Sequence, residues 1–341
     1  MQYFNCDYME GAHPKILQRL METNFDKTEG YGVDPYCDSA RDKIRKACGV
    51  PDAEVQFLVG GTQTNETVIS AFLRPYEGVI SADTGHVNCH EAGAIEHGGH
   101  KVLALPNVNS KISAEAIHHY CEVYYKDMSF EHMVKPGMVY ISQPTEYGTL
   151  YSKAELQEIR KVCDEYEMPL YIDGARLGYG LVAKENDVTL KDIAKLADVF
   201  YIGGTKVGAL FGEAVVIPDP NRIPHFFSIV KQHGALLAKG RILGIQFDTL
   251  FTDDLYLEIS QHAIDMAMKI KAGLKAKEYE FYIDSPTNQQ CVIVSNERAD
   301  ELSTGISIEM MDTYDDDHII IRFCTSWATR EEDVDALLEL L

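Results

Sequence analysis

Two short apolar runs, separated by a gap of helix length, constrain the fold of this chain more than any other feature. The first run, Leu170–Asp173, is followed by Gly-Ala-Arg176, and the second, Val199–Gly203, is followed by Gly-Thr-Lys206. Short β-branched and aromatic runs of this kind are typical of buried parallel strands. Because the carboxyl ends of parallel strands meet at one edge of a sheet, we expect Asp173, Arg176 and Lys206 to lie close together.

The first 217 residues repeat this alternation of strands and helices. Further strands are expected at Val55–Val59, Gly78–Ala82, Lys101–Ala104, Met138–Ser142 and, running back from a turn, Glu213–Ile217. Helices are expected at Asp38–Cys48, Glu66–Phe72, Ala114–Met128, Ser152–Tyr166 and Thr189–Leu196. The alternation predicts an α/β fold, in which a mostly parallel sheet carries helices on both faces.

The pattern changes after Pro224. The run from Ala235 to Lys277 is helical with few breaks, and it is followed by predicted strands at Glu280–Ile283, Cys291–Ser295, Ile306–Met310 and Ile319–Cys324 and a final helix from Thr329 to Leu341. A chain of 341 residues is long enough for two domains. We therefore expect a large α/β domain over residues 1–235, which includes the N-terminal segment, and a small α+β domain over residues 236–341.

Charge and composition limit the possible partners and location. The chain carries 31 Lys and Arg and 53 Asp and Glu side chains, a net charge of −22, which repels nucleic acid and anionic membrane surfaces. It has no run of about 18 apolar residues, no secretory signal pattern at its first residues and no Cys-x-x-Cys pair among eight cysteines. These features predict a soluble, cytoplasmic protein with reduced thiols.

Two further segments carry polar chemistry. The turn Gly60-Gly61-Thr62 lies between a predicted strand and a predicted helix, where free backbone N–H groups can bind a phosphate. Many such turns contain two glycines only because they turn tightly. The histidines between residues 86 and 100 do not have the spacing of metal ligands, so we predict no metal site.

Each of the three residues at the strand ends also has an ordinary structural explanation. Lys206 could be an exposed loop lysine, Asp173 could cap a helix, and Arg176 could pair with Asp173. Together with the glycine turn, however, a lysine, a carboxylate and a guanidinium suit a cofactor that presents an aldehyde, a ring nitrogen and an anion. Pyridoxal phosphate (PLP) is such a cofactor.

The same motifs resemble those of the low-specificity L-threonine aldolases, which are fold-type-I PLP-dependent enzymes of the β-eliminating lyase group. The similar segments are Asp173-Gly-Ala-Arg-Leu, Gly-Gly-Thr-Lys206, Gly60-Gly-Thr-Gln-Thr-Asn65 and Ile-Arg322-Phe-Cys-Thr-Ser-Trp-Ala-Thr. The resemblance, which extends from Asp7 to the final helix, implies a PLP-dependent transferase-like fold with a seven-stranded sheet. It also implies cleavage of L-threonine, L-allo-threonine or a related β-hydroxy-α-amino acid to glycine and an aldehyde.

The resemblance implies which residues bind the cofactor. Lys206 would be the catalytic lysine to which the cofactor aldehyde is attached, and Asp173 would pair with the pyridine nitrogen. Gly61 and Thr62 would bind the phosphate. His86 would stack on the cofactor ring and take part in catalysis.

The resemblance also implies how the substrate is bound. Arg176, which would lie beside the cofactor, and Arg322 would bind the α-carboxylate of the amino acid. Tyr31 would reach into the site of a neighbouring subunit, and Lys231 and Lys239 would approach a phosphate across the same interface. The protein is therefore expected to be a homo-oligomer with shared active sites, at least a dimer and, by analogy with the family, a tetramer.

One segment departs from the family pattern. Many members carry Glu-Asn-Thr-His-Asn after the strand at Met138–Ser142, whereas this chain has Gln143-Pro-Thr-Glu146-Tyr. Glu146 could act as the catalytic base if burial raises its pKa, or the site could favour a different β-substituent. Two other readings remain open at this point: β-elimination or transamination with the same cofactor, and a non-catalytic scaffold that keeps the fold.

Overall fold

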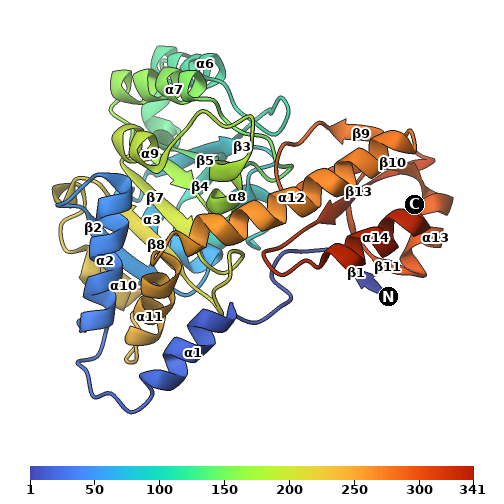
Figure 1. Ribbon diagram of the computed structural model, residues 1–341. Coiled ribbons are helices and arrows are strands. Elements are labelled where there is room, and N and C mark those ends of the chain that lie inside the picture. The colour runs from blue at the N-terminus through green and yellow to red at the C-terminus, as the bar shows by residue number, and fades with distance from the viewer.

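The computed structural model describes residues 1–341. A seven-stranded sheet forms the centre of its larger part, which we call the large lobe (Figure 1). In spatial order its strands are β2 (Glu54–Leu58), β8 (Glu213–Ile217), β7 (Val199–Gly203), β6 (Leu170–Asp173), β5 (Lys135–Ser142), β3 (Glu77–Ala82) and β4 (Lys101–Leu105). β8 runs in the opposite direction to the other six strands, which are parallel to one another.

Helices cover both faces of this sheet. One face packs against α1 (Pro14–Glu22), α2 (Pro35–Cys48), α6 (Ala114–Lys126), α7 (Lys153–Glu165), α8 (Leu177–Val182), α9 (Leu190–Leu196), α11 (Arg241–Leu250) and the first half of α12 (Leu255–Ala276). The other face packs against α3 (Gly61–Phe72), α4 (His86–Cys89), α5 (Ala94–His97) and α10 (Phe226–Gln232). Alternate strand residues face the two cores, as Ile172 and Tyr171 do. The predicted fold class is confirmed.

A second, smaller sheet forms the small lobe, which α12 connects to the large one (Figure 1). Its antiparallel strands lie in the order β12 (Glu309–Thr313), β13 (His318–Cys324), β10 (Gln289–Ser295) and β9 (Glu280–Ile283). The end of α12, α13 (Asn296–Ser303) and α14 (Glu331–Leu340) cover the sheet. No helix in the protein combines the length and apolar character needed to cross a membrane.

The N-terminal residues pack against the small lobe, although they precede the large lobe in the sequence. β1 (Gln2–Tyr3) pairs in parallel with β11 (Ile306–Ser307), and Phe4 is buried in the core of the small lobe. Both chain ends therefore lie on the small lobe (Figure 1). The predicted division at residue 235 stays a prediction, because α11 contributes to the large core and α12 contributes to both cores.

Some predicted helix boundaries are wrong. α3 begins at Gly61 rather than Glu66, since Gly60 is extended and the glycine turn is itself the first helical turn. The predicted helical run from Ala235 to Lys277 is interrupted where Asp253 and Asp254 adopt left-handed backbone angles between α11 and α12. The predicted strand at 306–310 is divided between β11 and β12. The short helices α4, α5, α8, α10 and α13 were not predicted.

Helix α2 begins at Pro35 rather than Asp38 because Asp34 caps it. Proline suits the first position of a helix, whose N–H group has no intrahelical partner. The buried Asp34 carboxylate accepts hydrogen bonds from the backbone N–H groups of Tyr36 at 3.0 Å and Cys37 at 3.0 Å. α2 then packs along α11, so this cap stabilises a contact inside the large core.

Replacing Asp34 by alanine should lower the free energy of unfolding by about 1–2 kcal/mol, because both N–H groups lose their acceptor. The loss can be measured by urea denaturation or as a lower thermal midpoint. Asp42→Ala in the same helix removes only an exposed ion pair with Arg45, and we expect a change within about 0.5 kcal/mol. Equal losses in the two variants would contradict the capping role of Asp34.

Candidate active site

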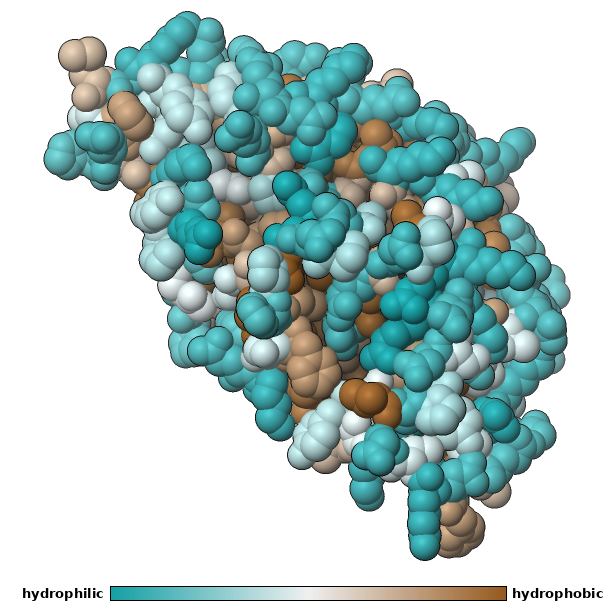
Figure 2. Space-filling view, turned by 90° about the vertical axis from the view of Figure 1, so that its left-hand side faces the viewer, coloured by the Kyte–Doolittle hydropathy of each residue, from teal (hydrophilic) through white to brown (hydrophobic).

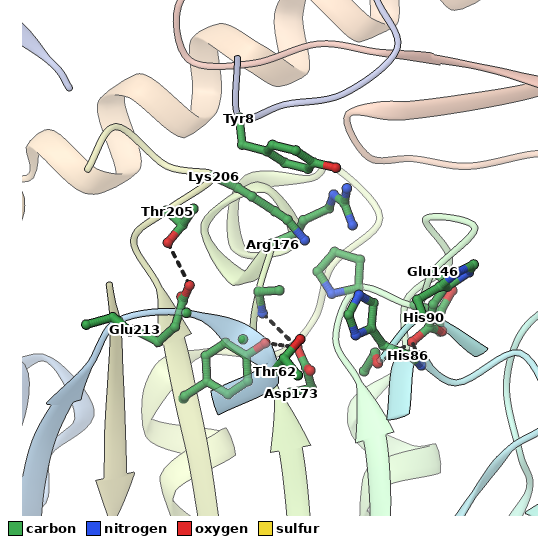
Figure 3. A pocket seen from close by; sticks show the side chains of 18 residues that line it. Tyr8, Thr62, His86, His90, Glu146, Asp173, Arg176, Thr205, Lys206 and Glu213 are labelled. Carbon is green, nitrogen blue, oxygen red and sulfur yellow. Dashed lines mark hydrogen bonds between the residues drawn. The ribbon is translucent and has the colours of Figure 1, made fainter. Parts of the chain in front are cut away.

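A cavity of about 390 Å³ lies at the edge of the large sheet where β5, β6 and β7 end (Figure 3). It brings together most of the predicted site residues: Gly61, Thr62, His86, Glu146, Asp173, Arg176 and Lys206. Its other lining residues were not predicted as site residues: Tyr8, Val59, Gly60, His90, Ser142, Pro144, Thr145, Ala175, Tyr201, Thr205 and Glu213. Two predicted residues, Tyr31 and Arg322, do not line it.

Four hydrogen-bond donors hold the carboxylate of Asp173. One oxygen accepts from the Tyr201 hydroxyl at 2.5 Å and the Ala175 N–H at 2.9 Å. The other accepts from the Tyr140 hydroxyl at 2.7 Å and the Asn65 amide at 3.1 Å. Burial and the nearby Asp173 charge raise the pKa of both tyrosines well above their usual value, so both remain donors. The carboxylate is therefore fixed in one orientation at the cavity floor.

The same network extends to His86. The Glu91 carboxylate lies 2.7 Å from Nδ1 of His86 and accepts a hydrogen bond from the Asn65 amide at 2.7 Å. The Tyr171 hydroxyl donates to the Asn65 oxygen at 2.6 Å, which fixes the orientation of the amide group. Asn65 thus joins the support of His86 to the support of Asp173. Outer hydrogen bonds of this kind orient the groups that contact a ligand.

Lys206 follows β7 and is partly buried beneath the ring of Tyr8, which lies 5.9 Å from the amine (Figure 3). Burial, and after it the charge of Arg176, lowers the pKa of the amine. A lowered pKa increases the fraction of neutral, nucleophilic amine at neutral pH. The Tyr179 hydroxyl donates to the Lys206 carbonyl at 2.5 Å and so anchors the loop that carries the lysine.

Arg176 pairs with Asp7, and the alternative pairing with Asp173 is wrong. Nε of Arg176 lies 2.7 Å from one Asp7 oxygen, and Nη2 lies 3.0 Å from the other. Burial opposes ionisation of Asp7, yet the Arg176 charge lowers the pKa of this carboxyl to about 2. The ion pair leaves Nη1 of Arg176 available at the cavity.

The remaining predicted arginine lies just outside the cavity, on β13 of the small lobe. Arg322 donates to the Gln289 side chain at 2.9 Å and to the Asn5 carbonyl at 3.1 Å, while its Nε is buried without a partner. Tyr31 lies on the surface, with 43% of its area exposed and the Lys231 amine 4.4 Å from its ring centre. Any contact of Tyr31 with a site would therefore involve another subunit.

Glu146 lies on the side of the cavity away from Lys206 (Figure 3). One of its oxygens accepts hydrogen bonds from the Ser142 hydroxyl at 2.6 Å and the His86 N–H at 2.9 Å. Burial raises its pKa. Next to it lies His90, whose ring centre is 5.7 Å from that of His86. The histidines of this region form no cluster of three or more metal-ligating side chains.

The cavity residues fit PLP. Helix α3 begins at Gly61 with no capping side chain, so the N–H groups of its first turn are available for a phosphate. Asp173 offers a fixed carboxylate for a ring nitrogen, and Lys206 offers an amine for an aldehyde. These three features lie around one cavity, as binding of a single cofactor requires.

Several supporting residues were missed by the reasoning from sequence. Tyr140 and Tyr201 carry a detectable signal, because each places a polar hydroxyl in an otherwise apolar buried strand. The pairing of Asp7 with Arg176 joins residues far apart in the sequence, and the role of Glu91 depends on the fold of the α4–α5 region. No local pattern distinguishes Asp7 or Glu91 from other acidic residues.

Comparisons with known proteins agree with this geometry. The profile of the family described as beta-eliminating lyase matches residues 4–299. Low-specificity L-threonine aldolases of Pseudomonas sp. (strain NCIMB 10558) and Pseudomonas aeruginosa are 32% and 30% identical to this chain, each over 77% of it and 75% of the relative.

The solved structures extend the likeness to the whole chain. A threonine aldolase of Leishmania major superimposes with a TM-score of 0.96 and 42% identity over 100% of this chain and 98% of its own. An aspartate aminotransferase of Thermus thermophilus superimposes with a TM-score of 0.76 at 16% identity, over 100% of this chain and 90% of its own, and shares the fold. The predicted resemblance, fold type and cofactor are confirmed. The chain belongs to the beta-eliminating lyase family and is a PLP-dependent lyase.

Proposed function

We propose that the protein cleaves L-threonine, L-allo-threonine or a related β-hydroxy-α-amino acid to glycine and an aldehyde. The observation that carries the proposal is the position of Glu146, a carboxyl group with a raised pKa, in the same cavity as Lys206 and Asp173. Such a group can accept the proton of a β-hydroxyl group, which breaking the Cα–Cβ bond requires. Relatives that are 30% to 42% identical are named threonine aldolases, which supports the same chemistry.

The cofactor-facing residues would act as follows. Bound PLP supplies an electron-withdrawing ring that stabilises negative charge at Cα. Asp173 would hold a proton on the pyridine nitrogen, and the four donors around the carboxylate fix it for that contact. His86, oriented by Glu91, would pack on the ring. Lys206 supplies the amine that reacts with the aldehyde, and its lowered pKa favours this role.

Glu146 would be the base at the β-hydroxyl group. Its Oε1 already accepts two hydrogen bonds, from the Ser142 hydroxyl and from the backbone N–H of His86. Oε2 has only a long contact of 3.5 Å with the Ser110 hydroxyl. Oε2 is therefore the oxygen available for the substrate proton. In this proposal Glu146 replaces the histidine that many family members carry.

The substrate carboxylate would be bound by Arg176 and Arg322. Asp7 holds Arg176 in place and leaves Nη1 for the ligand, while the buried Nε of Arg322 has no partner in the protein. Hydrogen bonds to charged groups contribute about 1.5–3 kcal/mol each. Two such contacts would fix which bond of Cα stands perpendicular to the cofactor ring.

The protein would act as a homo-oligomer, with a tetramer as the expected form. Apolar side chains gather in the hollowed centre of the face in Figure 2, and polar side chains surround them. Large exposed apolar residues on α1, the following loop and α10 are Leu17, Met21, Phe25, Tyr31, Val33 and Phe227. Apolar patches of this kind favour association. Tyr31, with Lys231 and Lys239 nearby, would then contribute to a neighbouring site.

A cytoplasmic location is part of the same proposal. All eight cysteines are free thiols, and six of them are buried. Free thiols are usual in a reducing compartment.

Product analysis tests the reaction directly. We expect the holoenzyme to release equal amounts of glycine and acetaldehyde from L-threonine or L-allo-threonine, measured by amino-acid analysis and an aldehyde assay. 2-Aminobutyrate lacks the β-hydroxyl group and should release no aldehyde. Ammonia with a 2-oxo acid as the main products would favour β-elimination, and a 2-oxo acid without free ammonia would favour transamination. Either result would contradict the proposal.

Lys206→Ala should remove both the visible absorbance of the bound cofactor and the activity, the latter by at least about three orders of magnitude. Lys184→Ala is the matched control, because it removes an exposed lysine with the same charge. This variant should keep both the cofactor absorbance and the activity. Full activity in Lys206→Ala would rule out the assigned role of Lys206. Failure of the unmodified protein to bind PLP would instead favour the non-catalytic scaffold.

Glu146→Gln should lower kcat by about two to four orders of magnitude, with little change in cofactor binding. In the unmodified enzyme, activity should rise with pH through the raised pKa of Glu146, because only the ionised form accepts a proton. Glu146→Gln should lose this acidic limb in its pH–rate profile.

Ser142→Ala provides the complementary test of Glu146. The Ser142 hydroxyl stabilises the ionised carboxylate, so its removal should move the acidic limb to higher pH. If the acidic limb of the pH–rate profile were the same in the unmodified enzyme, Glu146→Gln and Ser142→Ala, Glu146 would not be the base.

A further inference from the structure

Glu213 is a buried carboxyl group in the cavity for which the proposed reaction has no use. It begins β8, is only 4% exposed, and pairs with Leu58 of β2 on one side and Gly203 of β7 on the other. Leu58 leads into the phosphate-binding turn Gly60–Thr62, and Gly203 leads into the loop Thr205–Lys206. Glu213 therefore lies between the two segments that would bind the phosphate and the aldehyde of PLP.

The partners of Glu213 orient its carboxyl group without neutralising its charge. One oxygen accepts a hydrogen bond from the Thr205 hydroxyl at 2.8 Å, and the other accepts from the Gly204 N–H at 3.2 Å (Figure 3). The Thr205 oxygen also accepts a hydrogen bond from the Gly212 N–H at 2.9 Å, which fixes the orientation of this side chain. No lysine, arginine or histidine forms an ion pair with Glu213.

Burial favours the neutral form of Glu213 more strongly than its hydrogen-bond donors and Lys206 oppose it. Lys206 faces it from the loop after β7 and Asp173 faces it from β6. Three buried tyrosines from β6, β7 and α12 complete this environment: Tyr171, Tyr201 and Tyr256. Burial raises the pKa of Glu213 to about 8, although Thr205 and Lys206 oppose the shift. Near neutral pH the carboxyl group therefore keeps its proton.

A bound phosphate would strengthen this preference. The cavity is lined by one arginine and one lysine, and neither is free for the phosphate: Arg176 pairs with Asp7, and Lys206 would react with the cofactor aldehyde. An ionised Glu213 beside a phosphate dianion would repel it, whereas a carboxylic acid can donate a hydrogen bond to it.

We propose that Glu213 is a cofactor-positioning residue that stays protonated in the PLP-bound protein and donates its carboxylic-acid O–H to the phosphate group. The inference rests on PLP binding in this cavity, on which the proposed function also depends. It gives the phosphate site a neutral donor in addition to the N–H groups of α3. The proposal concerns cofactor affinity, so it can be tested without an activity assay.

The test compares PLP with pyridoxal, which lacks the phosphate group. The ratio of their dissociation constants, measured by absorbance titration of the apoenzyme at pH 7 and pH 9, isolates the contribution of the phosphate. Ionisation of Lys206 affects both ligands and largely cancels in the ratio. The second pKa of the phosphate is near 6, so its charge is nearly constant over this range.

We expect the advantage of PLP over pyridoxal to fall about tenfold from pH 7 to pH 9 in the unmodified protein. This follows because affinity that requires a protonated group falls about tenfold for each pH unit above a pKa of about 8. In Glu213→Gln the advantage should change less than about twofold, since the amide is a donor at every pH. Glu213→Ala should show an equally flat but smaller advantage.

Glu91→Gln is the matched control, because it alters another buried carboxyl group on the His86 side of the cavity. It should keep the tenfold fall. A flat ratio in the unmodified protein, or an equal fall in Glu213→Gln, would overturn the role of Glu213 while leaving the proposed reaction intact. A protein that binds no PLP at all would overturn both. If Glu213→Gln failed to fold, the ratio in the unmodified protein would still test the proposal, because a flat ratio would overturn it.

Discussion

The hydrogen bonding of Asp173 is the constraint on which the rest of the site depends. A buried carboxylate is costly unless its oxygens are satisfied, and here the donors come from three segments besides its own, β5, β7 and α3. These donors reach one carboxylate only if β5, β6 and β7 are parallel and aligned so that their carboxyl ends coincide. The order and register of the central strands are therefore also a condition for binding the cofactor ring.

The acidic groups in the cavity and directly behind it are controlled in different ways. Asp7 is ionised because Arg176 binds it bidentately, and Asp173 is held by uncharged donors. Glu146 and Glu213 have hydrogen bonds but no ion pair, and burial raises the pKa of both. A chain with a net charge of −22 can thus bind an anionic cofactor and the carboxylate of an amino acid, because its local groups limit the negative charge in the cavity.

Local sequence patterns predicted the sheet better than the helices, and the cofactor side of the site better than its supports. The strands Leu170–Asp173, Val199–Gly203 and Glu213–Ile217 were predicted to the residue, since apolar runs end abruptly at polar or glycine residues. The start of α3 was predicted too late because Gly61–Asn65 are poor helix formers that occupy a first turn. The Asp7–Arg176 pair and the Asn65–Glu91 bond exist only after folding, so no local pattern could predict them.

Asp7 also connects the two lobes at the site. Its carboxylate binds Arg176 of the large lobe and accepts a hydrogen bond at 2.9 Å from Asn288, which precedes β10 of the small lobe. The N-terminal segment that carries Asp7 is fixed to the small lobe by the pairing of β1 with β11 and by buried Phe4. Arg322 donates to the same segment at Asn5. The distance between the two arginines proposed to bind the substrate carboxylate is therefore set by this segment as well as by α12.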